Sequence, residues 1–124
     1  MINKQDFINS YTQDIEMVRG DTLCFNFQLK GLGSIRAYQD LEANFAVADG
    51  YDNPHLFDLS KGDGIELEEY SESTDTATFS VNVDPVLTKE LELARYYYDL
   101  QIKTGTNVIT LMRGRFTLVY DVSD

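Results

Sequence analysis

The feature that most constrains the fold of this chain is an alternation of apolar and polar residues that recurs along most of its length. The alternation is clearest over residues 22–30, where single residues such as Cys24 and Asn26 separate four apolar side chains: Leu23, Phe25, Phe27 and Leu29. Successive side chains of a β-strand point to opposite faces, so this period of two predicts a strand with one buried face.

The same pattern predicts further strands, which are separated by stretches rich in turn-forming residues, such as ADGYDNPH and YSESTD. One brief helix is expected from Pro85, within the segment DPVLTKELELA. Repeated helices of about ten residues or more are missing from the pattern, which argues against a parallel βαβ fold. The expected strands cover residues 15–18, 22–30, 41–47, 56–59, 65–68, 77–83, 96–103, 108–112 and 116–122.

Two of these nine ranges, 15–18 and 56–59, are brief, so we expect about seven or eight strands. Short strands with turns between them are typical of an all-β fold, and we predict a single antiparallel β-sandwich. It would span residues 14–124 and follow a short N-terminal arm formed by residues 1–13. Gly114 is expected to interrupt its strand at a bulge or tight turn. The alternation assigns seven large side chains to the core: Phe25, Phe27, Phe45, Phe79, Tyr98, Leu100 and Phe116.

The tripeptide Arg19, Gly20 and Asp21 spells RGD, which is also a cell-adhesion signal. An adhesion motif projects from a flexible loop tip, whereas this tripeptide leads directly into the strand over residues 22–30. Glycine accepts a positive φ without the steric penalty of a Cβ atom, and a turn before a strand often requires it. We therefore predict that Gly20 forms a structural turn.

The acidic balance of the chain limits its partners. Of 124 residues, 21 are Asp or Glu and 10 are Lys or Arg, which gives a net charge of −11. Such a surface repels the phosphates of nucleic acids and of anionic lipids, so neither nucleic acid nor a membrane is an expected partner. With Cys24 as the single cysteine, the chain can form no internal disulfide, which fits folding in a reducing cytoplasm.

The titratable residues form no recognisable catalytic motif. His55 is the single histidine, and nearby Ser60 has neither a nucleophile elbow nor a glycine signature for an oxyanion hole. Oxygen ligands for calcium occur together in one region, but their spacing is not that of an EF-hand loop: Asp49, Asp52, Asn53 and Asp58.

Several glutamates occur close together at residues 66–72, and paired carboxylates are the catalytic groups of glycosidases. Glu66 and Glu68 alternate with apolar residues, so a solvated strand face explains them. We therefore predict that the protein is not an enzyme, needs no cofactor and has no resident metal. A weak calcium site near Asp49 and Asp52 stays an open alternative.

Five apolar side chains are candidates for a protein interface. If Tyr96 and Tyr98 face the core, then Tyr97 faces outward, and Val119 does the same on the last strand. Neighbouring strands could join these two as an exposed apolar patch, a feature that often marks interfaces, although single exposed apolar residues are common. The N-terminal arm contributes the other candidates: Phe7, Ile8 and Tyr11.

Three segments carry a resemblance to a known family: RGDTLCFNFQL, TATFSVNVDPVLTKELELARYYYDLQI and NVITLMRGRFTLVYDV. Together they resemble the immunoglobulin-like domains of tailed-phage structural proteins, and in particular the N-terminal domain of siphophage baseplate upper proteins. The resemblance covers most of the chain after Ile15 and rests on strands and turns, without a catalytic signature. It implies an immunoglobulin-like sandwich.

The resemblance also implies a function. We expect a phage or prophage virion protein that acts as an assembly or adaptor module in the tail or baseplate. Its partners would be other phage structural proteins and further copies of itself, because phage particles are symmetric. The alternative is a carbohydrate-binding module that presents exposed tyrosines to a glycan. A flat row of aromatic side chains on one sheet face would favour the glycan, and a patch at an edge or terminus would favour assembly.

Overall fold

The computed structural model describes residues 12–50 and 52–120, and the prediction of an all-β fold is confirmed over them. The arm candidates Phe7, Ile8 and Tyr11 lie outside the described residues. The strands are β1 (Ile15–Val18), β2 (Leu23–Lys30), β3 (Glu42–Ala48), β4 (His55–Lys61), β5 (Gly64–Ser71), β6 (Thr76–Val83), β7 (Arg95–Thr104) and β8 (Asn107–Val119).

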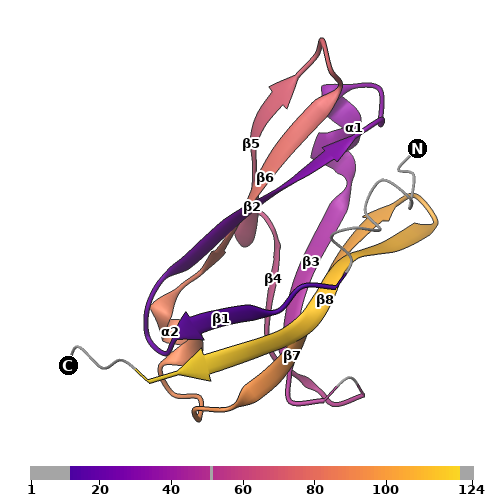
Figure 1. The fold of residues 1–124 in the computed structure, drawn as a ribbon. Helices are drawn as coiled ribbons and strands as arrows, with labels where there is room; N and C mark the ends of the chain where they lie inside the picture. Colours follow the sequence, from indigo (N-terminus) through magenta and orange to yellow (C-terminus); the bar gives the residue numbers. More distant parts are fainter. Residues whose placement is uncertain (1–11, 51, 121–124) are drawn as a thin grey trace.

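The strands form one continuous sheet in the order β1-β8-β7-β3-β4-β5-β6-β2, where sandwich packing would have given two separate sheets (Figure 1). The sheet curls so that its two end strands, β1 and β2, come close at the turn that joins them. Its narrowest connection is between β4 and β5, where only Ser60 and Lys61 pair with Gly64 and Ile65. The described fold is therefore an almost closed, barrel-like sheet.

Two strand pairs are parallel, so the prediction of a purely antiparallel arrangement is wrong in this respect. β1 runs parallel to β8, with Ile15 opposite Phe116 and Val18 opposite Val119. These are the first and last strands of the described chain, and no hairpin joins them, so nothing requires opposite directions. The short β4–β5 contact is parallel as well.

The core fills the inside of the curled sheet. The predicted core residues Phe45, Phe79, Leu100 and Phe116 are fully buried, and Tyr98 is 2% exposed. Aromatic rings connect opposite sides of the curled sheet. The Phe25 ring on β2 contacts the Phe45 ring on β3 edge to face, at a centroid distance of 5.7 Å. Phe25 departs from the prediction, since it is only half-buried.

Two short helices cover gaps in the sheet. The predicted helix is present as α2 (Pro85–Thr88), with Asp84 as its N-cap. The second helix, α1 (Ile35–Asp40), lies between two of the predicted strands, where the sequence analysis placed no helix. Its N-cap Ser34 accepts a hydrogen bond from the Ala37 N–H, and its buried residue Tyr38 anchors it to the core. A helix this short has too few turns to display an apolar period.

Gly114 does not interrupt its strand, which corrects the prediction, because β8 runs unbroken from Asn107 to Val119. The register of the β7–β8 pair shifts elsewhere, between Leu100 and Gln101. The glycine is needed for another reason. A Cβ atom at Gly114 would lie 2.3 Å from the backbone oxygen of Gln13, so only glycine allows the incoming chain to approach β8 this closely.

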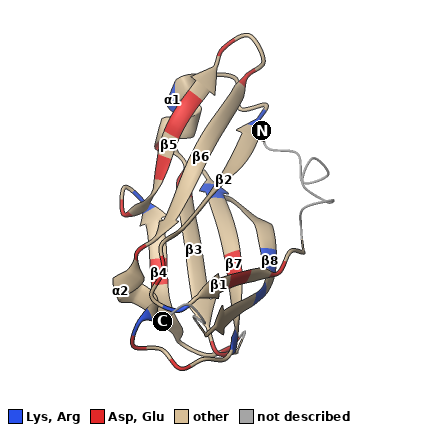
Figure 2. Ribbon diagram, turned by 60° about the vertical axis from the view of Figure 1, so that its left-hand side comes forward, with Lys and Arg blue, Asp and Glu red and all other residues tan. Residues whose placement is uncertain are grey.

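Acidic residues are spread over several strands and loops of the described chain (Figure 2). None of the helices among the described residues is both long and apolar enough to cross a membrane.

Candidate functional site

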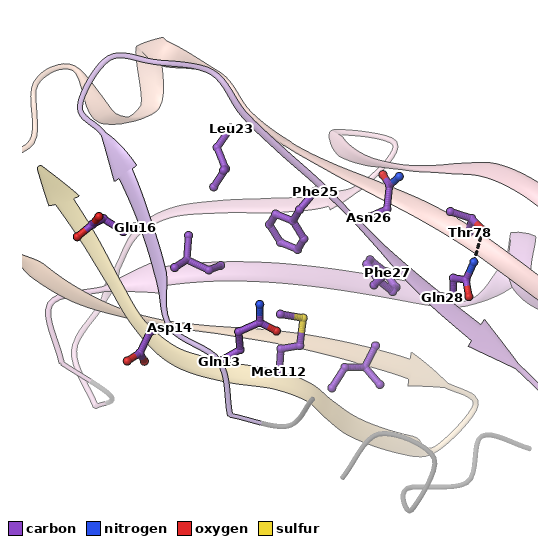
Figure 3. Close-up of a pocket in the computed structure, with 12 residues that line it drawn as sticks. Gln13, Asp14, Glu16, Leu23, Phe25, Asn26, Phe27, Gln28, Thr78 and Met112 are labelled. Atoms are coloured by element: carbon purple, nitrogen blue, oxygen red, sulfur yellow. Dashed lines mark hydrogen bonds between the residues drawn. The ribbon is translucent and has the colours of Figure 1, made fainter. Parts of the chain in front are cut away.

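An open groove of about 710 Å³ lies between β2 on one side and β1 with β8 on the other (Figure 3). It lies where the two end strands of the sheet diverge after the turn that joins them (Figure 1). Its position follows from the topology, because the sheet closes everywhere except between β1 and β2. We call it the edge groove.

The β2 wall of the edge groove is apolar. Leu23, Phe25 and Phe27 project into the groove from alternate positions of the strand (Figure 3). Leu23 and Phe25 are half-buried, whereas Phe27 is 9% exposed and stacks on Phe79 with a centroid distance of 5.1 Å. The wall thus offers two partly exposed apolar side chains, Leu23 and Phe25, beside the nearly covered Phe27.

Hydrogen bonds hold the opposite wall against β8. The Gln13 N–H donates to the Arg113 carbonyl over 2.9 Å, and the Arg115 N–H donates to Asp14 Oδ1 over 3.0 Å. The Tyr98 hydroxyl donates to the Gln13 carbonyl. Residues 13–16 are therefore a fixed wall, which Leu111 and Met112 of β8 extend with apolar surface.

The turn at the closed end of the groove contains the RGD tripeptide, and the predicted conformation is confirmed. Gly20 has a φ of +85°, and its N–H donates to Thr88 Oγ1 over 3.1 Å. Arg19 Nη1 donates to the Leu91 carbonyl over 3.1 Å. The tripeptide is thus bound into the structure by its backbone and by its arginine.

The charge of the edge groove has one sign. Among the described residues, its charged lining residues are Asp14 and Glu16, both exposed, and no described lysine or arginine lines it. The polar remainder is uncharged and lies just before β1 and on β2 and β6: Gln13, Asn26, Gln28 and Thr78. Gln28 Nε2 donates to Thr78 Oγ1 over 3.3 Å. The groove combines an apolar floor with a polar, mildly acidic rim.

A second groove of about 650 Å³ crosses β4, β3 and β7 and has polar and apolar surface in equal parts. Asn44 lies opposite both Ser60 and Gln101, so these side chains form a row across three neighbouring strands. Partial burial lowers the pKa of Lys61, and its ammonium donates to the Gln39 carbonyl. No aromatic side chain lines this groove.

Titratable groups come together around His55. His55 Nδ1 lies 2.6 Å from Asp58 Oδ1, and both Asp58 and Asp99 pair with Ala46 from opposite sides of β3. Desolvation raises the pKa of Asp99, an effect that His55 opposes and Asp58 reinforces. The adjacent hollow is only about 30 Å³ in volume, which is small for a substrate.

The residues considered for the alternative of a calcium site are divided between different partners. Asp49 Oδ1 accepts a hydrogen bond from Asn53 Nδ2 over 2.7 Å, while Asp58 pairs with His55. Within residues 12–50 and 52–120, no three His, Cys, Asp or Glu side chains are grouped as metal ligands would be. Glu66, Glu68 and Glu69 are exposed on β5, as predicted for a solvated face.

Sequence reasoning missed a tyrosine–aspartate cluster below the β5–β6 turn. Asp75, at a φ of +50°, accepts hydrogen bonds from Tyr38, Tyr70 and the Gly33 N–H. Burial acts to raise the pKa of Asp75, but these hydrogen bonds outweigh it and hold the pKa below its usual value. The cluster fixes α1 to the β5–β6 turn.

The structure does not bring Tyr97 and Val119 together. Tyr97 pairs with Arg115, and Val119 lies four residues further along β8, about 13 Å away in an extended strand. Val119 instead pairs with Val18 of β1, and both candidates are half-buried. The two residues therefore do not form a joint apolar patch, although each one stays an interface candidate by itself.

Sequence reasoning also missed the partly exposed face of β2. Phe25 would have pointed to it if the sequence had shown that this strand lies at an edge of the sheet.

No protein-family model and no curated protein sequence matches this chain. Among solved structures, it is similar in fold to a family 123 glycoside hydrolase from Clostridium perfringens that acts on glycolipid glycans, with a TM-score of 0.53 and 10% identity. The match covers all of this chain but 26% of the hydrolase, so the likeness concerns the fold of one part of that enzyme.

AggA, the major subunit of aggregative adherence fimbriae type I from Escherichia coli, matches with 11% identity over 88% of this chain and 90% of its own. Its TM-score of 0.39 is too low to carry an argument.

Proposed function

We propose that this protein is an assembly or adaptor module of a tailed-phage tail or baseplate, which works by protein–protein contact. The observation that carries the proposal is the edge groove, an apolar hollow between the two end strands of the sheet. Exposed strand edges beside apolar surface are places where other chains add.

The sequence resembles the immunoglobulin-like domains of phage structural proteins, and this resemblance is the reason for placing the module in a phage particle. In this proposal β5, β6 and β2 form one layer of an immunoglobulin-like sandwich, the other strands form the second layer, and the β4–β5 connection is the corner. Its partners are other structural proteins of the virion and further copies of this chain.

The test is the composition of phage particles. Particles induced from the strain that encodes this chain would be purified by density gradient and analysed by mass spectrometry. We expect peptides of this chain in the particles, at a constant ratio to the major tail protein. Peptides found only in the cell lysate, with none in purified particles, would refute the proposal.

Self-association follows from the same proposal and has its own test. Each copy carries a net charge of −11, so salt should tighten association by screening the repulsion. Analytical ultracentrifugation at low and high salt would detect this. A strict monomer in both conditions at high protein concentration would leave only docking to a different protein.

The carbohydrate-binding alternative receives less support from the described surface. The exposed aromatic side chain there is Tyr120, at the C-terminal end, and the other large exposed apolar residues are aliphatic. A flat row of tyrosines, which would stack on sugar rings, is not formed by residues 12–50 and 52–120. The row of Asn44, Ser60 and Gln101 could still hydrogen-bond a glycan. Binding to a glycan array would favour this alternative.

A further inference from the structure

We infer that the edge groove binds an extended, non-acidic segment of a partner protein, which adds to the sheet as a further strand beside β2. This inference rests on the proposed function and names the kind of partner that the assembly module takes.

The backbone is the first reason. β2 pairs with β6 on one side only, and β1 pairs with β8 on one side only, because they are the two ends of the sheet. Each therefore presents an edge to the groove that pairs with no other described strand. Backbone N–H and C=O groups at an edge need partners, and an extended polypeptide supplies them at the matching repeat.

The side chains are the second reason. Leu23, Phe25 and Phe27 enter the groove at every second position of β2. A strand lying beside β2 would place its own alternate side chains on the same side and cover this row. Leu111 and Met112 offer apolar contacts from the opposite wall.

The negative charge of the edge groove is the third reason, and it indicates which kind of segment binds there. Asp14 and Glu16 are the charged residues of the lining, and the whole chain carries −11. A second copy of the chain would bring the same negative charge to the groove. A segment of another protein with alternate apolar residues and lysine or arginine near its ends meets the groove without this repulsion.

A peptide panel tests the inference. Each peptide is about ten residues long, so that it spans the eight residues of β2 with one to spare at each end. In each test peptide, threonine alternates with a single type of apolar residue, which is Val, Leu, Ile or Phe in different peptides. Both ends of each test peptide carry lysine. Matched controls carry glutamate at the ends, a scrambled order, or N-methyl groups at alternate residues, which block strand pairing. Binding to the full chain is measured by fluorescence anisotropy, and the site is mapped by amide chemical shifts.

We expect a lysine-ended alternating peptide to bind, with shifts concentrated in β2 and residues 13–16. Scrambling or N-methylation should abolish binding. Glu16→Lys should weaken the lysine-ended peptide several-fold and favour the glutamate-ended one. Glu72→Lys, in the turn after β5, is the matched charge control and should change neither. Phe25→Lys should abolish binding, and because it could also destabilise the fold, Glu16→Lys keeps the test independent of folding.

Failure of the whole panel to bind would overturn the inference, while detection of the chain in phage particles would leave the proposed function standing. Equal binding of the N-methylated peptide would overturn strand addition. Self-association of the full chain that Phe25→Lys abolishes would mean that a second copy occupies the groove, which also overturns the inference.

Discussion

The two sides of the curled sheet use the same sequence pattern and reach different degrees of burial. β3 lies between β4 and β7, and its inward residue Phe45 is fully buried. β2 has a partner on one side only, and its inward residue Phe25, which touches Phe45, is half-buried. Alternation decides which face a side chain occupies, but it does not decide how completely that side chain is covered. Phe25 is half-buried where β2 borders the edge groove, whereas Leu29, further along the same strand and outside the groove, is fully buried.

The largest expected effect tests this difference directly. Phe45→Ala should lower the free energy of unfolding by about 3–5 kcal/mol, because it leaves a cavity in a closed core. Phe25→Ala should cost about 1–2 kcal/mol, since half of its surface is already in water. Chemical denaturation of both variants is the measurement. Equal losses would mean that the groove side is as well covered as the centre of the sheet.

The next largest loss of stability is expected from a substitution in the wall of the edge groove. Gly114→Ala should destabilise by about 1–3 kcal/mol, because the new Cβ must push the Gln13 backbone away from β8. Hydrogen exchange should become faster at residues 13–16 and stay unchanged in β3. Thr117→Ala, on the same strand but without such a close backbone approach, is the control. Unchanged exchange at the wall would show that β1 is held from elsewhere.

Substitutions in the turn that joins the two end strands should lower the free energy of unfolding by a similar or smaller amount. Gly20→Val should cost about 1–3 kcal/mol, because a β-branched residue is strained at a φ of +85° even though nothing lies within 4 Å of its Cβ position. Gly20→Asn should be milder, since asparagine tolerates this conformation better. Arg19→Ala should leave a cell-adhesion assay unchanged. A Gly20→Val protein that melts like the parent would contradict the role of the turn.

The smallest expected effect concerns Asp75, in the turn between β5 and β6. Its pKa is lowered in the folded state, so the stability it contributes is present above the unfolded pKa and is lost as the pH falls through the folded value. Asp75→Asn, which keeps a residue suited to a φ of +50°, should flatten the acid side of the stability profile below about pH 4. Denaturation at several pH values measures this.

Tyr70→Phe supplies the control for Asp75, because it removes one of the hydrogen bonds that lower this pKa. The acid loss of stability should then begin at a higher pH than in the parent. An unchanged profile in both variants would mean that Asp75 plays no part in the acid sensitivity.

Local patterns in the sequence were sufficient for the strands and for most of the core. The period of two placed β2, β3, β6 and β7 with the correct inward faces, because side-chain direction in a strand depends only on position. Gly20 was identified as a turn because glycine is the residue that accepts its positive φ at no cost. Pro85 marked α2, since proline suits the first turn of a helix.

Features that depend on distant residues were decided by the tertiary structure. α1 is too short for a periodic signal and is held by Tyr38 against Asp75, 37 residues away. The role of Gly114 depends on Gln13, about a hundred residues earlier in the chain, so its sequence neighbours suggested a break where there is none.

The edge groove belongs to the same class of feature. Leu23, Phe25 and Phe27 look like any other buried row in the sequence, because alternation carries no information about which strands are neighbours. The sheet order leaves β1 and β2 at its two ends, and this alone turns half of a core strand into an accessible wall. The sequence by itself determined the strands and their inward faces, and the long-range pairing of those strands decided where the molecule stays open.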